Sequence, residues 1–565
     1  IQPNKRFHSL SVMFGIIGRV FVICCGFAFA TANSCAESSL PPWPQSYVGK
    51  GAISIPFSEI TEPFQIWYDG TKGLEKVRMD YYGGQTKVFE FANFKNDKGR
   101  TYQIVPETTE TLKNKMICEV VDATDDNPVV VSSVLPDPTN FKCIGKGAVN
   151  GIDAEKWITT VTQESVTLEK IMWIKWKNDA KTGKKVAIPV AYESVSYDAN
   201  LGTHYKHEVV YLYTFNILTP PKSVWTVPKV CNNASAVDDL SMVHPVKEIV
   251  HQHDHHINLA WSEFLFAHDR KFNDSSEHTT RKNIFSQNHR LVNSHNRANH
   301  GYKLALNHLA DRTDEELKAL RGRKPTLEYN GGSVFPYSED ELKTVSLPIN
   351  FDWRISGAVN PVKNQASCGS CWSFGTTGTL EGAYFLKTGK LISLSEQALM
   401  DCSWGFGNNG CDGGNDYTSY QWIMKHGGIP LEEEYGPYEA MDGFCHTDEV
   451  KLVSPITGWV NVTTHNERAL KMAIFKHGPI SIGINASLRT FGLYSNGVYY
   501  DPQCKGSEAD LDHAVLAVGY GWVNHKKYWL VKNSWSNNWG NDGYILMEIK
   551  NNNCGVMTTP TYVTM

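Results

Sequence analysis

The sequence predicts an α+β protein of several domains, and three parts of the chain support this class. Strand-like alternation, rich in β-branched and aromatic residues, marks the first part of the chain. Charged and apolar residues at helical spacing mark the middle, over 277–296. In the last part, an apolar helix is expected after Cys371 and a buried strand after His513. At roughly 150 residues per domain, 565 residues allow about three or four domains.

The first region, residues 33–235, is expected to be an antiparallel β domain. Strand patterns occupy 87–91, 171–176 and 207–215, and turn signals lie between strands at Asp69-Gly70, Gly83-Gly84 and Asn150-Gly151. Its four cysteines form an even set, which predicts two disulfides whose pairing the spacing leaves open: Cys35, Cys118, Cys143 and Cys231. No catalytic constellation is found in this region.

The N-terminus predicts export. Met13 is expected to start translation, and a short segment with Arg19 then precedes the apolar run 20–30. Ala30-Thr31-Ala32 resembles a cleavage site, so residues 13–32 are predicted to be a signal peptide. The run is too short for a membrane anchor, and no other stretch approaches about 18 apolar residues, so no membrane span is expected.

A cysteine in a Gly/Ser-rich turn is the most informative local feature. Cys371 follows Cys368-Gly-Ser and precedes Trp372-Ser-Phe, which can continue as a helix. The positive end of a helix dipole favours the nucleophilic thiolate. Gln365, six residues earlier, can offer its amide to a developing oxyanion. The alternatives are a pair of disulfide cysteines and a Cys-x-x-Cys redox motif.

Two downstream motifs favour nucleophilic catalysis. His513 lies about 140 residues after Cys371 and opens a run of small apolar residues. Twenty residues later, Asn533 can accept the imidazole N–H and hold the reactive tautomer, and Trp535 can shield that bond from water. A lone His or Asn is more often structural. Three motifs in this order and spacing favour catalysis instead.

Residues 347–565 resemble the papain family of cysteine proteases, close to its cathepsin L branch. The resemblance implies a peptidase of two subdomains, one helical and one like a β-barrel. It also implies that Cys371 is the nucleophile, His513 the acid/base, Asn533 the orienter of His513, and Gln365 an oxyanion-hole donor. The other implied substrate-binding residues are Gly413, Gly414, Asn415, Asp416, Leu511, Asp512, Trp535 and Thr559.

This segment holds seven cysteines, so one thiol is left over if the rest pair, and spacing alone allows fifteen pairings of the other six. The resemblance implies Cys368–Cys411, Cys402–Cys445 and Cys504–Cys554. The S2 subsite implied by Asn415, Asp416, Leu511 and Thr559 has no acidic floor, so an apolar P2 side chain is expected, with Asp416 able to admit a basic one at the rim.

Residues 256–320 resemble the inhibitory propeptide of cathepsin L-like zymogens. The ERFNIN signature corresponds to Glu277, Arg281, Phe285, Asn288, Val292 and Asn296, with Val292 in place of Ile. The following Gly-x-Asn-x-Phe-x-Asp motif corresponds to Ala305, Asn307, Leu309 and Asp311, with Ala and Leu in place of Gly and Phe. This segment is expected to fill the active-site cleft in the direction opposite to a substrate. Residues 321–346 are expected to be an activation loop suited to cleavage.

The layout of the first region resembles insect haemocyte proteinases of the twenty-six/twenty-nine-kilodalton type, which are two-chain enzymes. The N-terminal domain is therefore considered as a chain retained after processing. Its strands also resemble open lipoprotein-carrier half-barrels, which raises a ligand pocket between sheet and helix as an alternative. A folding or targeting module is the favoured interpretation.

Eleven of the twenty histidines fall between residues 244 and 308. His251, His253, His255 and His256 are weighed as metal ligands, but no cysteine or closed ligand set accompanies them, so no metal is expected. A solvated linker is favoured, and a pH-responsive propeptide is the sharper hypothesis. The net charge of −5 and the lack of a basic cluster argue against a nucleic-acid partner.

The sequence therefore predicts a secreted or lysosomal cysteine endopeptidase, made as a zymogen and needing no cofactor. Its expected partners are peptide substrates and its own propeptide. Four Asn-x-Ser/Thr sequons, at Asn233, Asn273, Asn461 and Asn485, are candidate glycan sites. The alternatives are an aminodipeptidase like cathepsin C, a catalytically dead binding protein on the same fold, and a lipid carrier with a secondary protease.

Overall fold

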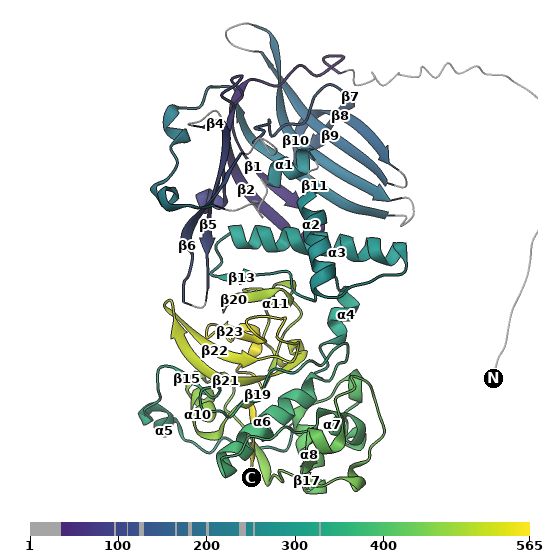
Figure 1. Cartoon of the computed structure of the whole chain (residues 1–565), viewed down its shortest axis with the longest axis vertical. Coiled ribbons are helices and arrows are strands. Elements are labelled where there is room, and N and C mark those ends of the chain that lie inside the picture. The colour runs from purple at the N-terminus through teal and green to yellow at the C-terminus, as the bar shows by residue number, and fades with distance from the viewer. Residues whose placement is uncertain are drawn as a thin grey trace, which may run out of the picture.

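The computed structural model describes residues 35–565 except 95–97, 110, 124–128, 164–165, 179–182, 199–202, 237–244, 252–254 and 327–328. The predicted signal peptide, residues 13–32, lies outside the described residues. Figure 1 shows three layers stacked along the long axis: a large N-terminal sheet, a helical middle layer, and the C-terminal region below it. The predicted α+β class is confirmed.

The N-terminal region is one sheet of twelve strands in the order β12-β6-β5-β4-β3-β2-β1-β11-β10-β9-β8-β7. All neighbours are antiparallel except β12, which runs parallel to β6. The strands are β1 Ser46–Ile55, β2 Ile60–Asp69, β3 Lys76–Tyr81, β4 Thr86–Phe94, β5 Lys98–Glu107, β6 Lys115–Asp122, β7 Lys142–Val149, β8 Ile152–Gln163, β9 Val166–Asn178, β10 Lys185–Asp198, β11 Thr203–Asn216 and β12 Ser235–Ala236.

Local sequence explains this meander. The three predicted strand patterns lie within β4, β9 and β11. Asn150 and Gly151 join β7 to β8 with φ of 49° and 71°, the left-handed values that favour Asn-Gly in a two-residue hairpin. Two disulfides tie distant strands together: Cys35–Cys143 and Cys118–Cys231.

A short helix that the sequence analysis did not assign packs against this sheet. Helix α1, Pro245–His251, buries Val246, Ile249 and Val250 in the sheet's apolar cluster. Lys247 of α1 forms a buried ion pair with Glu90. In Figure 1, α1 lies against the sheet near β1 and β10. The face of the sheet is therefore filled by the chain itself at this point.

The predicted propeptide forms the middle layer. It contains α2 His255–Ala267, α3 Ser275–Arg297, β13 Tyr302–Leu304 and α4 Asp314–Ala319. Asp274 caps α3 by accepting hydrogen bonds from the backbone N–H groups of Ser276 and Glu277. The rings of Trp261 and Phe264 of α2 pack at a tilt against Phe285 of α3, which is fully buried.

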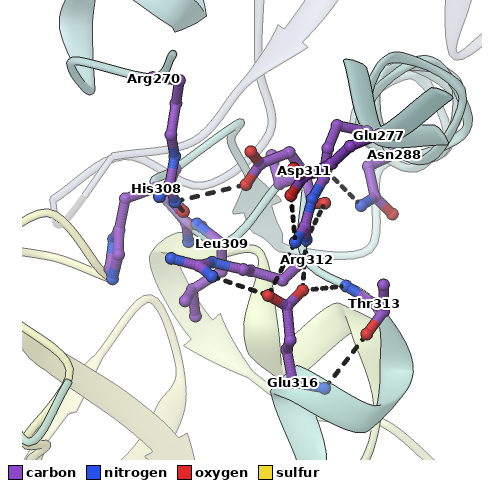
Figure 2. A network of polar contacts seen from close by, with 12 residues as sticks. Arg270, Glu277, Asn288, His308, Leu309, Asp311, Arg312, Thr313 and Glu316 are labelled. Carbon is purple, nitrogen blue, oxygen red and sulfur yellow. Dashed lines mark hydrogen bonds and ion pairs between the residues drawn. The ribbon is translucent and has the colours of Figure 1, made fainter. Parts of the chain in front are cut away.

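The signature residues of α3 hold the segment that follows the helix (Figure 2). Arg281 bonds to the carboxylate of Glu316, which also belongs to the capping box that opens α4 at Thr313. Asn288 donates to the carbonyl of Ala310 at 2.8 Å. Asn296 exchanges two hydrogen bonds with the backbone of Leu304, which fixes β13 against the helix.

Helix α3 also contacts the N-terminal sheet through buried charges. Arg297 donates two hydrogen bonds to Glu62, at 2.6 and 2.8 Å, and their side chains are 6% and 2% exposed. Arg290 lies 3.1 Å from Glu208 of β11. Burial alone lowers the pKa of Arg297, but Glu62 keeps it above its ordinary value. The sheet and the propeptide helix are thus one packed unit.

The C-terminal region combines a helical and a sheet part. The helices are α6 Cys371–Thr388, α7 Glu396–Cys402, α8 Asp416–His426, α9 Glu432–Tyr435, α10 Glu467–His477 and α11 Arg489–Gly492. The strands are β15 Phe351–Asp352, β16 Ile429–Pro430, β17 Leu452–Val453, β18 Gly458–Asn461, β19 Ile480–Ile484, β20 Tyr494–Tyr499, β21 His513–Val523, β22 Lys526–Lys532, β23 Tyr544–Glu548 and β24 Thr561–Thr564. Strand β13 of the propeptide pairs with β20 and so joins the two layers.

The predicted activation loop has more structure than expected. β14, Ser333–Val334, pairs with β18, and α5, Glu339–Thr344, begins with a capping box formed by Ser338 and Glu341. Ser-x-x-Glu is a sequence signature of a helix N-terminus, so this helix could have been predicted. Among the described residues, no helix is long and apolar enough to cross a membrane.

Removing the cation of the buried pair should destabilise the N-terminal unit. Arg297→Met leaves the Glu62 carboxylate buried without its partner, a loss of about 3–5 kcal/mol. The matched control is Arg354→Met, whose ion pair with Asp352 is 42% exposed on the arginine side and should contribute less than about 1 kcal/mol. Urea unfolding of both variants, made in a Cys371→Ala background to prevent self-cleavage, measures the difference. Equal shifts would contradict the prediction.

Candidate active site

Cys371 is placed at the N-terminus of α6 by a turn that needs small residues. Its side chain is fully buried, and it is the one free cysteine among the described residues. Gly369 allows the turn to approach the backbone of Cys411, since a Cβ there would lie 2.4 Å from the Cys411 carbonyl oxygen. The Sγ atom accepts hydrogen bonds from the N–H groups of Gly322 at 3.3 Å and Ala514 at 3.4 Å.

His513 and Asn533 come from neighbouring strand ends. His513 opens β21, and Asn533 directly follows β22, which pairs with β21. The imidazole Nε2 donates to Asn533 Oδ1 at 2.8 Å, which leaves Nδ1 buried and without a hydrogen-bond partner. The ring of Trp535 lies 4.7 Å from the His513 ring, centroid to centroid, and covers it.

Gln365 is buried and held on both sides of its amide. Its Oε1 accepts a hydrogen bond from Ser534 Oγ at 2.7 Å, which fixes Nε2 as the donor end. Nε2 donates to the carbonyl of Cys368 at 2.7 Å and to the carbonyl of Leu320 at 2.9 Å. Leu320 belongs to the predicted propeptide, so a propeptide carbonyl accepts a hydrogen bond from the amide that the sequence predicts to be an oxyanion donor.

Residues 320–324 pass directly through this site. Arg323 forms a parallel bridge with Gly414, and the backbone of Arg323 donates to the Asp512 carbonyl at 3.0 Å. Gly322 is bonded to Gly414 through its carbonyl, at 2.9 Å. The thiol therefore faces an amide N–H of Gly322, which is not an electrophile. This contact covers the thiol without offering it a reactive carbonyl.

The covered cleft keeps the candidate catalytic pair neutral. Burial raises the pKa of Cys371 to about 11, although the amides of Ala514 and Gly322 act in the opposite direction. Burial likewise lowers the pKa of His513 to about 4, although the hydrogen bond that His513 donates to Asn533 acts in the opposite direction. Thiol and imidazole are the favoured forms in this state. The thiolate expected from the helix dipole requires a cleft open to water.

The structure brings most of the predicted substrate-binding residues around the propeptide strand. Gly413 and Gly414 face Gly322, and Asn415 continues this wall into α8. The Leu511 carbonyl and Thr559 Oγ1 accept hydrogen bonds from the Arg323 guanidinium at 3.3 and 3.2 Å. The Asp512 carboxylate pairs with Arg321 at 2.8 Å.

The Asp416 carboxylate is engaged by neighbouring residues of the peptidase. It accepts a hydrogen bond from Thr561 Oγ1 at 2.6 Å and one from the backbone of Tyr417 at 2.8 Å. Glu508, which the sequence analysis missed, meets Arg323 instead, at 2.8 Å. No local motif distinguished Glu508, because its place depends on a contact with a residue far away in the sequence.

The cystines frame this site. The structure joins Cys368 to Cys411, Cys402 to Cys445, and Cys504 to Cys554, the pairs that the resemblance implies. The first pair anchors the turn before Cys371 to the cleft wall. The last pair anchors the loop that carries Glu508. Among the described residues, one cluster of side chains has metal-ligand spacing, Cys35, Cys143 and Glu155, but its two sulfurs form a disulfide.

Comparison with known proteins gives the same assignment. Residues 347–564 match the papain family cysteine protease model, and residues 261–317 match the cathepsin propeptide inhibitor domain. Procathepsin L of Rattus norvegicus is 42% identical over 318 residues, which cover 55% of this chain and 92% of the relative. The chain belongs to the papain family of cysteine proteases. It is a cathepsin L-like zymogen with its propeptide.

Other relatives show the same extent of similarity. A cathepsin L-like peptidase of Aedes aegypti is 43% identical, over 54% of this chain and 91% of the relative. A solved structure of digestive procathepsin L 3 from Tenebrio molitor larval midgut has a TM-score of 0.50 and 36% identity, over 55% of this chain and 99% of that one. Neither family model extends to the N-terminal side of residue 261.

A side chain at Gly322 should release the inhibition. A Cβ there would lie 1.7 Å from the carbonyl oxygen of Gly369, so the propeptide strand must move away from Cys371. For Gly322→Ala, we expect the affinity of the propeptide for the cleft to fall about 10- to 100-fold, from an overpacking cost of about 1–3 kcal/mol. Residual peptidase activity of the unprocessed chain measures this.

The control for this experiment is Gly405→Ala, because Gly405 is exposed and a Cβ there meets no atom within 4 Å. It should leave the residual activity of the unprocessed chain at the wild-type level. Identical residual activity in both variants would show that the close approach at Gly322 does not hold the propeptide in place.

Proposed function

We propose that this zymogen yields an endopeptidase whose nucleophile is Cys371 and whose acid/base is His513. The observation that carries the proposal is the arrangement of donors around Leu320: Gln365 Nε2 points at a peptide carbonyl beside the free thiol. Asn533 orients the imidazole through Nε2, so that Nδ1 remains for the proton of the thiol.

Catalysis begins once the propeptide has left the cleft. The Cys371 proton passes to His513 Nδ1, and the thiolate attacks the carbonyl carbon of the scissile peptide. The carbonyl π electrons move onto oxygen, where Gln365 Nε2 and the backbone N–H of Cys371 stabilise the oxyanion. Collapse of this intermediate breaks the C–N bond, and the imidazolium protonates the leaving amine.

Deacylation reverses the proton transfer. Neutral His513 takes a proton from water, whose oxygen attacks the thioester carbon. The second oxyanion occupies the same donors, and the acid product leaves as the proton returns to Cys371. Asn533 retains one imidazole tautomer throughout, and the ring of Trp535 limits the access of water to that hydrogen bond.

The pocket formed by Leu511 and Thr559 is proposed to select the P2 side chain. Leu511 is buried and apolar, and Thr559 carries no charge. We expect an apolar P2 residue to be accepted, with broad preference among sizes, since one methylene changes selectivity only by roughly 10–200-fold.

The disulfides and the predicted signal peptide support the proposal that the chain is exported. Five disulfides among the described residues fit an oxidising route to a lysosome, granule or extracellular space. Of the sequons, Asn273 is exposed and is the proposed glycan site. Asn485 is 7% exposed, so it cannot carry a glycan without local rearrangement.

The domain limits 33–235, 256–320, 321–346 and 347–565 are proposed as the processing units. Cleavage within 321–346 separates the peptidase from the rest of the chain. Because α3 shares buried ion pairs with the sheet, the propeptide and the N-terminal domain should separate from the peptidase together or remain bound together. Mass spectrometry of the termini of the processed protein identifies the cleavage sites.

Changes to the proposed machinery should have distinct effects. Cys371→Ala should abolish turnover while leaving the cystines intact, and an epoxide warhead should label Cys371 alone in the processed wild type.

Gln365→Ala should lower kcat about 10²- to 10³-fold, because one oxyanion donor is lost. The control is Gln503→Ala at an exposed position. Hydrolysis of an N-blocked peptide measures the effect and separates an endopeptidase from an aminodipeptidase.

The histidine cluster divides into two classes in the structure. Burial lowers the pKa of His289 to about 4, that of His295 to about 3, and that of His308 to about 4. His256 instead lies 3.5 Å from Glu248, where protonation strengthens the contact. His253 and the side chain of His255 fall outside the described residues. The buried class supports an acid-released propeptide.

The sign of this effect follows from the lowered pKa values. The three buried imidazoles are neutral in the packed zymogen, so their contribution to the stability of the folded propeptide is full above about pH 6.5 and is lost as the pH falls toward 4. Arg270 and Arg312 face His308, and Arg290 and Arg297 lie near His289, so protonation adds repulsion. Glu248 near His289 offsets part of it.

Replacing His289, His295 and His308 by Gln should therefore shift the pH midpoint of propeptide release downward. Hydrogen bonds from Arg281 and the backbone of Thr313 overcome burial and lower the pKa of Glu316 to about 2, so this carboxylate acts only in stronger acid. The control is His525→Gln, at an exposed position. Release is followed against pH in the Cys371→Ala background. An unchanged midpoint would assign the trigger to carboxylates.

A further inference from the structure

The segment that directly follows the propeptide places an arginine in the proposed S2 subsite. The Arg323 side chain is 8% exposed. Its guanidinium donates to Glu508 Oε1 at 2.8 Å, to Thr559 Oγ1 at 3.2 Å and to the Leu511 carbonyl at 3.3 Å. Two of these three partners are residues that the sequence analysis assigned to the S2 subsite. The pocket thus holds a cation by direct hydrogen bonds.

Glu508 is held in place by a short turn, and one of its two carboxylate oxygens accepts no hydrogen bond. It opens a short turn, Glu508–Asp510, which is closed by hydrogen bonds between Ser507 and Asp510 and lies close to the Cys504–Cys554 cystine. Its Oε1 also accepts the N–H of Thr326, which lies in the same segment as Arg323. Its Oε2 is buried and has no hydrogen-bond partner. When this segment leaves the cleft, Oε1 loses both of these partners, and both oxygens of a partly buried carboxylate can accept hydrogen bonds from a substrate.

The opposite wall of the pocket is open because residue 483 is a glycine. A Cβ at Gly483 would lie 2.5 Å from Arg323 Nε, and its three nearest atoms would all belong to Arg323. Gly483 lies in β19, where it pairs with Ala514 next to His513. The missing side chain gives the pocket the depth that a guanidinium on an aliphatic stem requires.

We propose that Glu508 is a specificity-determining residue that lets this peptidase accept arginine at P2 beside apolar residues. The inference rests on the proposed function of the same cleft. The space left by Gly483 receives the aliphatic stem, and the carboxylate holds the charged end. Arginine should be preferred to lysine, because the planar guanidinium group of arginine can donate hydrogen bonds to both carboxylate oxygens. Asp416 is already engaged by Thr561 and does not supply this charge.

The test compares two N-blocked fluorogenic dipeptides, Leu-Arg and Arg-Arg, which differ only at P2. The full chain is processed by acid, and active sites are titrated with an epoxide so that only folded enzyme is counted. We expect Glu508→Gln to lower the Arg-to-Leu ratio of kcat/KM about 10- to 100-fold. Gly483→Ala should lower the same ratio by loss of space, and Asp416→Asn should leave the ratio unchanged.

The outcomes separate the inference from the function on which it rests. Absence of turnover of both peptides by the wild type would overturn the proposed function. Turnover of the Leu peptide with an unchanged ratio in Glu508→Gln would overturn the inference alone. A fall of the ratio in Asp416→Asn but not in Glu508→Gln would assign the charge to Asp416 and also overturn it. If Glu508→Gln gives no titratable enzyme, Gly483→Ala decides.

Discussion

Helix α3 is the constraint on which the arrangement of this chain depends. Through Arg297 it is bonded to Glu62 of the N-terminal sheet, in a pair almost fully removed from water. Through Asn288 and Asn296 it fixes the backbone that follows, including the strand that pairs with β20 of the peptidase. A shift of this helix would leave a buried charge without its partner on one side and buried backbone groups without hydrogen bonds on the other, and both losses are costly.

The cleft inhibits with the same atoms that are proposed to catalyse. Gln365 donates to the Leu320 carbonyl, and the thiol of Cys371 accepts from the N–H of Gly322. Because the propeptide also excludes water, burial raises the pKa of Cys371 and lowers that of His513, so the pair is held in its neutral forms. The segment in the cleft therefore has two effects. It blocks access to the thiol, and by excluding water it keeps the thiol and the imidazole in their neutral forms.

Much of the fold and site was predictable, because it is encoded over short distances along the chain. Alternation predicted strands now found in β4, β9 and β11, and the spacing of Phe285 and Asn288 predicted α3. Even α5, which was missed, carries its capping signature at Ser338. The interpretation of the N-terminal region could not go further from sequence, because α1 fills the sheet through contacts that no local pattern indicates.

The sequence by itself determined which residues form the site: a cysteine at the start of a helix, a histidine at the start of a buried strand, and an asparagine after the next strand. Tertiary structure alone decided how these groups behave and what surrounds them. Burial set the pKa values of Cys371 and His513. A contact between Arg323 and Glu508, 185 residues apart, defined the acidic end of the pocket. Such contacts depend on how distant segments pack, which residue spacing along one chain does not record.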